Sequence, residues 1–342
     1  MSRRRHIKEA VIDILTLCML CLLIAWGFFN QGEVMRYSPV SLRYDAPISG
    51  KAAYAARQYS ILHGNDDMFW PTFWREHKSE FITGFSSADA DCIAYSGDAS
   101  LVWPFEYVTG SAPGVTDGAG CVVSESLARR IWGSVDITGM TVEVDGVART
   151  IRGVFRGSAD LALISFRDDD TSRSWTAVEL SGGPVDPSRG DAESYAITSG
   201  LGRPDTILTG RHITFARTLA LLPLLIPAAY TLALTGRLIR KRWPESFRNI
   251  LFIGIAALAC LLPALVNVLP ASMVPTRWSD FSFWASLLRD SLDGLREFLN
   301  AAPRLRDADL KLLLLKQSGL AIVSVCAAAV LCFRWRPERS LS

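Results

Sequence analysis

The sequence predicts an α-helical membrane protein with four transmembrane helices and an α+β domain on the extracytoplasmic side. Three observations predict this fold class: the hydropathy, the number of long apolar segments and the distribution of charge. The chain of 342 residues is 49% hydrophobic and has a mean hydropathy of +0.21, which is too apolar for an ordinary soluble protein of this length. Four segments approach the roughly 20 apolar residues needed to cross a bilayer core of about 30 Å. Because four segments of this length make up only a minor part of the 342 residues, most of the chain is expected outside the lipid.

The first expected span covers about residues 11–29 and follows a basic N-terminus. Its apolar run is longer than that of a usual signal peptide, and no small-residue cleavage pattern follows it. We therefore interpret residues 1–29 as a cytoplasmic end followed by an uncleaved membrane anchor rather than as a signal peptide. Three further spans are expected at about residues 218–236, 250–269 and 318–333.

Basic residues indicate how these spans are oriented. The short loop between the second and third spans contains five of them: Arg237, Arg240, Lys241, Arg242 and Arg248. Further arginines precede the first span and follow the fourth. Since cytoplasmic loops are enriched in Lys and Arg, both termini and this loop are expected in the cytoplasm. Segments 30–212 and 271–317 are then extracytoplasmic, and residues 213–342 form a permease-like region with three spans.

Segment 30–212 is expected to be an acidic domain. It contains 24 acidic and 16 basic residues, a net charge of −8, whereas the rest of the chain has a net charge of +10. A surface that binds nucleic acid needs clustered positive charge. We therefore expect no nucleic acid partner for this domain.

Local patterns within this domain predict a mixture of helices and strands. Helices are expected over 52–62, 126–132 and 186–197, and strands over 92–95, 121–123, 141–144, 147–155 and 175–180. Ser124 is a suitable N-cap for the second helix, and Gly133 can adopt the left-handed conformation that ends it. Asp145-Gly146 joins two β-rich runs and favours a type I′ hairpin turn. The mixture predicts an α+β fold.

The seven cysteines follow the same division. Five lie in or beside the expected spans, where a small apolar side chain needs no chemical role. Cys92 and Cys121 lie in the extracytoplasmic domain, where a disulfide would contribute about 3 kcal/mol. The sequence leaves two alternatives open, a Cys92–Cys121 disulfide or two buried free thiols.

A set of short motifs in this domain carries a family resemblance. In chain order they are Gly110-x-x-Pro113, the run Gly120–Gly133 (GCVVSESLARRIWG), Ile137–Val142 (ITGMTV) and Ile151–Phe155 (IRGVF). Their order resembles the MacB-like periplasmic core domain of MacB/FtsX-type ABC transporter permeases. The expected arrangement of one helix, a large external domain and three further helices is also similar to that family.

The resemblance implies a permease or mechanotransmission subunit of an ABC transporter in a bacterial cell (inner) membrane. A separate cytoplasmic ABC ATPase would drive the helices, and the extracytoplasmic domain would convert their motion into export or efflux. The family also implies a homodimer, or a heterodimer with another permease subunit. The basic loop from Arg237 to Arg248 is then the candidate ATPase contact, and membrane lipid is a further partner. The alternative is an orphan membrane-anchored binding or scaffold protein that retains the fold without an ATPase.

One segment departs from the family pattern. The loop between the third and fourth spans is usually brief, whereas segment 271–317 is long and contains Trp278, Phe281, Phe283 and Trp284, followed by residues of mixed charge. An amphipathic helix fits this composition, either on the outer leaflet or packed under the domain. A solvated connector is the alternative.

The chain contains no motif for catalysis. It has no G-x-x-x-x-G-K-[ST] phosphate loop, no H-E-x-x-H zinc motif and no G-x-S-x-G nucleophile elbow. His63 and His77 flank acidic residues, but an exposed polar loop is the simpler interpretation. The run Asp168–Asp170 lacks the spacing of a calcium-binding loop. We expect no catalytic residue, metal or cofactor in this chain, and ATPase activity in a separate subunit.

Overall fold

The computed structural model describes residues 2–38, 40–64, 67–184, 187–224, 281–301 and 304–334. Within the chain, two compact units are distinguished. The sheet unit comprises Met35–Arg211 and Gly294–Leu310, and the helical unit comprises Met1–Val34, His212–Asp293 and Lys311–Ser342.

Three expectations fall outside the described residues. They are the span at 250–269, most of the span at 218–236, and the basic loop with Arg237, Arg240, Lys241, Arg242 and Arg248.

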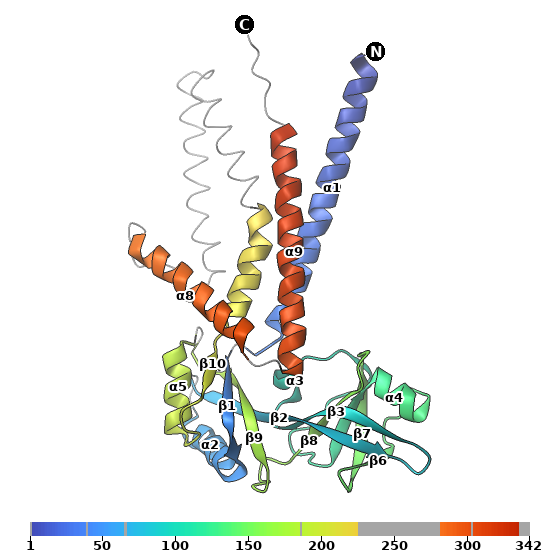
Figure 1. The fold of residues 1–342 in the computed structure, drawn as a ribbon, viewed down its shortest axis with the longest axis vertical. Helices are drawn as coiled ribbons and strands as arrows, with labels where there is room; N and C mark the ends of the chain where they lie inside the picture. Colours follow the sequence, from blue (N-terminus) through green and yellow to red (C-terminus); the bar gives the residue numbers. More distant parts are fainter. Residues whose placement is uncertain are drawn as a thin grey trace. The chain divides into compact units, whose positions relative to one another are not determined.

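The described part of the sheet unit contains one ten-stranded sheet (Figure 1). Its strands are β1 (Val40–Ser49), β2 (Phe69–Ile82), β3 (Ser87–Ser96), β4 (Tyr107–Gly110), β5 (Gly120–Ser124), β6 (Thr141–Val144), β7 (Val147–Phe155), β8 (Leu161–Ser165), β9 (Ser174–Gly182) and β10 (Thr206–Leu208). The strand order is β10-β1-β9-β2-β3-β8-β5-β7-β4, and β6 pairs with both β2 and β7. Six strands, β2, β3, β8, β5, β7 and β6, therefore close into a ring, while β9, β1 and β10 extend from β2 and β4 pairs with β7.

Helices cover both faces of this sheet. They are α2 (Gly50–Leu62), α3 (Ala99–Val102), α4 (Glu125–Trp132) and α5 (Arg189–Thr198). Successive strand residues alternate between two apolar cores, because side chains on a strand point to opposite faces in turn. Phe73 and Val178 belong to the larger core with residues of α2, α4 and α5. Their neighbours Trp74 and Ala177 belong to the smaller core with residues of α3.

Several local predictions are confirmed. The Ser124 hydroxyl accepts a hydrogen bond from the backbone N–H of Leu127, and Gly133 ends α4 in the left-handed region with φ 70°. The hairpin between β6 and β7 turns at Asp145 and Gly146, which both have positive φ, 54° and 75°. A type I′ turn requires this geometry. The predicted helices at 52–62 and 186–197 correspond to α2 and α5, with ends shifted by a few residues.

The interpretation of the segment around His77 as an exposed loop is wrong. Glu76 and His77 lie within β2, which pairs with β3, β6 and β9. The four consecutive polar residues Arg75–Lys78 hide the alternation that normally marks a strand. Strands β1, β4, β8 and β10 were also not predicted from the sequence.

Three glycines of the motifs, Gly110, Gly120 and Gly153, lie where two segments of the chain touch. Gly110 has φ +67°, and a Cβ there would collide with the carbonyl oxygen of Arg152. A Cβ at Gly153 would lie 2.8 Å from the backbone N of Ser111, and one at Gly120 would lie 2.7 Å from Cβ of Pro113. The Gly-x-x-Pro motif therefore packs against the start of β5 and against β7, and Gly110, Gly120 and Gly153 are needed because a Cβ at any of them would collide with the neighbouring segment.

Replacing Gly110 with alanine is expected to lower the free energy of unfolding of the sheet unit by about 2–5 kcal/mol, through the left-handed φ and the collision with Arg152. Gly114→Ala in the same loop is the control, because a Cβ at Gly114 meets nothing within 4 Å. Thermal unfolding of the purified full chain measures both variants. Equal transition temperatures would contradict the packing described for the motif.

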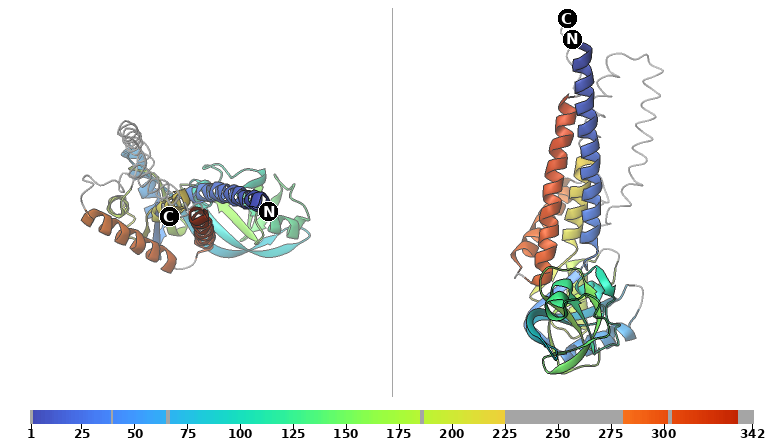
Figure 2. Two further views of the ribbon diagram at one scale, coloured as in Figure 1. Left: turned by 90° about the horizontal axis from the view of Figure 1, so that it is seen from above. Right: turned by 90° about the vertical axis from the view of Figure 1, so that its right-hand side faces the viewer.

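The helical unit contains long helices that run side by side. The helices α1 (Ser2–Met35) and α9 (Leu305–Arg334) are antiparallel neighbours along the part of each that belongs to this unit (Figures 1 and 2). Apart from Leu320, the buried positions on α9 from residue 314 onward recur at alternating steps of three and four residues: Leu314, Gln317, Ala321, Ser324, Ala328 and Leu331. This spacing is typical of helices that pack as a left-handed pair.

Amide side chains join three helices of this unit. The amide nitrogen of Asn30 donates to Oε1 of Gln317 at 2.9 Å and to the carbonyl oxygen of Leu313 at 3.1 Å. Nε2 of Gln317 donates to the carbonyl oxygen of Ala216, in the helical residues 211–224, at 3.4 Å. Within the described residues, two helical segments are long and apolar enough to cross a membrane, Ile14–Met35 and Leu305–Phe333.

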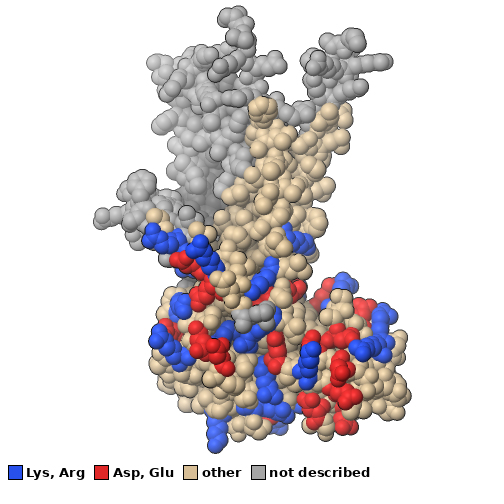
Figure 3. Space-filling view, in the orientation of Figure 1, with Lys and Arg blue, Asp and Glu red and all other residues tan. Residues whose placement is uncertain are grey.

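Charged residues are distributed unevenly between the units. Acidic and basic side chains are interspersed over the face of the sheet unit seen in Figure 3, whereas the described surface of α1 and α9 there is mostly uncharged. The expected extracytoplasmic loop at 271–317 contains a helix, α8 (Phe281–Asn300), rather than a continuous solvated connector. Its last residues belong to the sheet unit together with the start of α9.

Candidate functional site: a buried charge cluster

Three chain segments that connect to long helices meet on strand β1 of the sheet unit. β1 itself follows α1 in the chain. β10, which pairs with β1 through Ser41–Arg43, precedes the helical residues 211–224. The first residues of α9 reach the same strand, where Asp307 accepts a hydrogen bond from Arg43. One region of the sheet is therefore linked to three helices through short stretches of chain.

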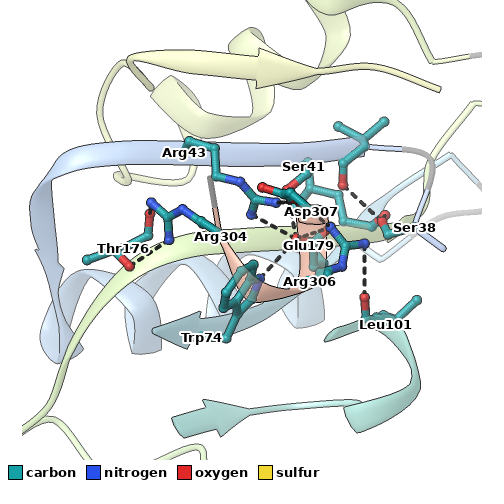
Figure 4. A network of polar contacts seen from close by, with 12 residues as sticks. Ser38, Ser41, Arg43, Trp74, Leu101, Thr176, Glu179, Arg304, Arg306 and Asp307 are labelled. Carbon is teal, nitrogen blue, oxygen red and sulfur yellow. Dashed lines mark hydrogen bonds and ion pairs between the residues drawn. The ribbon is translucent and has the colours of Figure 1, made fainter. Parts of the chain in front are cut away.

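A buried carboxylate lies at the centre of this region. Glu179 on β9 has no exposed surface. Its Oε1 accepts four hydrogen bonds (Figure 4), from Oγ of Ser41 at 2.7 Å, Nη1 of Arg43 at 2.9 Å, Nε1 of Trp74 at 2.9 Å and Nη1 of Arg306 at 3.0 Å. Asp307 joins them by accepting from Nη2 of Arg43 at 3.0 Å. We call these six residues the Glu179 cluster.

The register of the sheet explains why the strand members converge. Ser41 on β1 lies directly opposite Glu179, and Arg43 lies two residues further along the same face. On the other side of β9, Trp74 of β2 is paired with Ala177 and is therefore a diagonal neighbour of Glu179. Directly opposite and diagonal side chains on one face are close enough to interact. The alternating residues Val40, Leu42 and Val178 belong to the larger core on the opposite face.

The charges of the cluster balance. The side chains of Arg43, Glu179, Arg306 and Asp307 are each 6% exposed or less. Removing an ion from water costs several kcal/mol, and only well-placed partners offset this cost. One cation and one anion come from the sheet, and one of each from α9. The sheet and the start of α9 therefore complete each other's charge pairing.

The same two carboxylates act on both arginines of the cluster. Burial alone would lower the pKa of Arg43, but the carboxylates of Asp307 and Glu179 outweigh it and raise this pKa. Arg306 faces the same two carboxylates, with Glu179 at 3.0 Å and Asp307 at 3.8 Å. Arginine remains protonated in proteins, so both side chains carry their charge at neutral pH.

Further contacts fix the start of α9 on the sheet. Nη1 of Arg304 donates to Oγ1 of Thr176 at 2.9 Å, and the backbone N–H of Leu305 donates to Oε1 of Glu76 at 2.8 Å. Glu76 thereby satisfies one of the N–H groups that have no partner within a helix end. Burial raises the pKa of Glu76, while the Leu305 N–H and Arg304 act in the opposite direction.

Aromatic rings line the same contact. The guanidinium of Arg43 lies 4.8 Å from the ring centre of Trp74, and that of Arg304 lies 5.4 Å from it. Arg306 lies 5.4 Å from the ring centre of Tyr37, whose hydroxyl donates to Oδ2 of Asp309 at 2.5 Å. Tyr37 is the second residue after the end of α1. The residues after α1 and the first turns of α9 are therefore joined directly as well as through the sheet.

Sequence reasoning missed this cluster. Ser41, Arg43 and Glu179 occupy the polar positions of alternating strands, a pattern that normally indicates a solvent-facing side. Arg306 and Asp307 fall in the mixed-charge part of segment 271–317, which was expected to be an external loop. The one available signal was a pair of opposite charges directly before the apolar run of α9, and this signal is common at helix ends.

The two cysteines of the sheet unit are free thiols. Cys92 and Cys121 are both buried, and they lie on β3 and β5, which are separated by β8. Strands two places apart are roughly 9.5 Å apart, beyond the roughly 7 Å between Cα atoms that a disulfide can span. Of the two alternatives left open by the sequence, the structure has the pair of buried thiols.

These thiols are expected to resist alkylation in the folded protein. Burial raises the pKa of Cys92 to about 12 and that of Cys121 to about 12, so the reactive thiolate is scarce at neutral pH as well as inaccessible. In a variant with serine at the other five cysteines, maleimide should label neither residue in the native state and both after unfolding without reductant. Absence of labelling after unfolding, reversed by reductant, would instead indicate a disulfide.

The described residues contain no group of three or more His, Cys, Asp or Glu side chains placed to hold a metal ion. Nε2 of His77 on β2 lies 3.5 Å from Oδ2 of Asp145, in the turn between β6 and β7. Burial lowers the pKa of His77 despite this carboxylate. Asp168 contacts Arg57, while Asp169 and Asp170 contact Arg167 and Arg173. These acidic residues are therefore used in ion pairs.

Comparisons with known proteins give similarities in structure only. No protein-family model matches the chain, and no curated protein matches its sequence. Among solved structures, the chain is similar to the extracellular domain of the noncanonic ABC-type transporter YknZ from Gram-positive bacteria. The sequence identity is 10% and the TM-score is 0.40, and the aligned region covers 50% of this chain and 97% of that one. It is also similar to the periplasmic region of MacB from Actinobacillus actinomycetemcomitans, with 12% identity and a TM-score of 0.41, covering 51% and 89%.

Proposed function

We propose that this chain is the permease-like, force-transmitting subunit of an ABC transporter in a bacterial cell membrane. The sheet unit would work outside the cytoplasm, and a separate ATPase would supply the energy. One observation carries this proposal. The first residues of α9, a helix apolar and long enough to cross a membrane, are built into the sheet unit by the Glu179 cluster.

The cluster favours joint movement of α9 and the sheet. If α9 withdrew alone, Arg43 and Glu179 would lose Arg306 and Asp307 while remaining among buried residues. Arg43 and Glu179 would keep only each other as ion-pair partners, and loss of a well-placed partner of a buried charge is costly, so displacement of the helix end would be transmitted to β1 and β9 rather than absorbed at the contact. The hydrogen bond between Tyr37 and Asp309 adds the chain that follows α1 to the same moving part.

Energy would enter on the cytoplasmic side. We assign the ATPase contact to the basic loop with Arg237, Arg240, Lys241, Arg242 and Arg248, which the positive-inside rule places there. The chain has no phosphate-binding loop of its own, so it would be a non-enzymatic subunit without a metal or cofactor. A two-fold partner, either a second copy or another permease subunit, would complete the transporter.

Copurification tests this function. The tagged full chain is extracted from its native membrane in mild detergent, and the proteins that accompany it are identified by mass spectrometry. A P-loop ATPase in stoichiometric amount is the expected result. Recovery of the chain without an ATPase, under conditions that keep a known ABC transporter intact, would favour the orphan scaffold alternative.

The coupling loop is tested by charge reversal. Replacing Arg240, Lys241 and Arg242 with glutamate should abolish ATPase association, because an anionic loop cannot make the same ion pairs. Replacing the exposed Arg129 of the sheet unit with glutamate is the control and should leave association unchanged. Membrane insertion is checked in parallel by carbonate extraction. Unchanged association of the inserted triple variant would contradict this contact.

A further inference from the structure

The last residues of helix α8 pack within the sheet unit. Nη1 of Arg189, in the first turn of α5, pairs with both carboxylate oxygens of Glu297 at 2.9 and 3.1 Å. Phe298 beside it is 3% exposed. The last turn of α8 is therefore held by an ion pair and a buried aromatic ring.

The positions of α8 divide into an apolar and a polar face. Apolar residues at 281, 284, 288, 292, 295 and 299 recur at steps of three and four, which places them on one side of a helix. Two of these with described side chains, Leu292 and Leu299, are 49% and 50% exposed. Two leucines of this face are therefore half exposed among the described residues.

The charges of α8 are ordered around these leucines. Arg289 and Arg296 are exposed and, being seven residues apart, occupy the same border of the apolar face. Asp293 and Glu297 lie further round, on the polar side. Helices that lie in a membrane interface have this arrangement, with cations at the level of the lipid phosphates, apolar side chains below them and acidic groups toward water.

Continuity of the chain brings α8 to a membrane surface. Only four residues separate Asn300 from Leu305, where α9 begins, and α9 is one of the two helices apolar enough to cross a bilayer. A helix tethered to a membrane span in this way meets the lipid surface at high effective concentration, so modest burial of apolar side chains is sufficient to hold it there.

We propose that α8 is an interfacial helix that inserts Leu292 and Leu299 among the lipids of the outer membrane face, with Arg289 and Arg296 at the phosphate level. The inference rests on the membrane placement proposed above. The sheet unit is then in contact with the lipid surface through the Arg189–Glu297 pair, in addition to its connections through the long helices.

Fluorescence quenching in vesicles tests this inference. The full chain, with serine at its other cysteines, carries a single cysteine at Leu292→Cys or, as the matched control one residue further round the helix, at Asp293→Cys. Each is labelled with an environment-sensitive fluorophore and reconstituted into phosphatidylethanolamine and phosphatidylglycerol vesicles. Quenching by a nitroxide-labelled lipid is expected to be about threefold stronger at 292 than at 293, and quenching by aqueous iodide correspondingly weaker, since only the apolar face enters the lipid.

A third protein separates failure of the inference from failure of the membrane placement. It retains only the native Cys18, an exposed residue of α1, which lipid nitroxide should quench if the chain is inserted. Quenching at Cys18 with iodide-accessible label at 292 would overturn the interfacial helix and leave the proposed function intact. Protection of position 292 from both quenchers would also overturn it, in favour of a protein partner on this face. Absence of lipid quenching at Cys18 would overturn both.

Discussion

Replacing Glu179 with alanine is expected to lower the melting temperature of the sheet unit by roughly 6–20 °C, corresponding to a loss of about 3–5 kcal/mol. The substitution removes the acceptor of four hydrogen bonds. It also leaves Arg43 and Arg306 buried with Asp307 as their single anion. An uncompensated buried charge is costly, because neither water nor a second carboxylate can replace the lost partner.

Glu80→Ala is the matched control for this effect. Glu80 is a strand glutamate of the same sheet, on β2, but it is exposed, and surface substitutions of this kind change stability by about 0.5 kcal/mol or less. The melting temperature of each full-length variant is measured in the same detergent. A shift at Glu179 no larger than the shift at Glu80 would show that the cluster is open to solvent and contributes little.

Replacing Arg306 with glutamate is expected to release the start of α9 from the sheet. The new carboxylate would lie beside Glu179 and Asp307, so that three anions would face Arg43 alone. Like charges at this separation repel strongly where water is excluded. Undocking of the segment 304–309 is the cheaper outcome, because Arg43 and Glu179 remain paired within the sheet. We expect the sheet itself to remain folded.

Trypsin detects this release. Cleavage after Arg304 and Lys311 should be slow in the native chain and faster on the order of tenfold or more in the Arg306→Glu variant, since proteolysis requires local opening. Lys311→Glu is the control, because it reverses a charge five residues further along the same helix. The rate of cleavage after Arg304 is compared between the Arg306→Glu and Lys311→Glu variants. Equal rates after Arg304 in the two variants would contradict the role assigned to Arg306.

Helix α4 and the hairpin between β6 and β7 could be predicted because local chemistry decides them. The Ser124 cap and Gly133 end of α4 need only the residues of one helix and its flanks. The same holds for the Asp145-Gly146 turn, whose two positive φ angles suit these residue types. The motif with Gly110 and Gly153 also pointed to the correct region, although the reason for its glycines, the absence of room for a Cβ, became visible only from the packing.

The Glu179 cluster could not be predicted because its members are distant in the chain. Arg43 and Asp307 are separated by 264 positions, and each looks like an ordinary surface residue in its own segment. The face that alternation assigns to solvent is covered by residues 304–309, which the sequence placed in an external loop. A buried charge is recognisable only when its partner is known, and here the partner lies on the far side of a long intervening segment.

Hydrogen exchange of the native chain in membranes tests the central claim most directly. If the start of α9 is built into the sheet unit, the backbone amides of residues 305–310 should exchange as slowly as those of β1 and β9, because opening them requires separation of the buried charges. Figure 4 shows the contacts that this protection depends on. Exchange of 305–310 as fast as that of an exposed helix end, with β1 and β9 still protected, would show that α9 is not docked on the sheet and would contradict transmission through the Glu179 cluster.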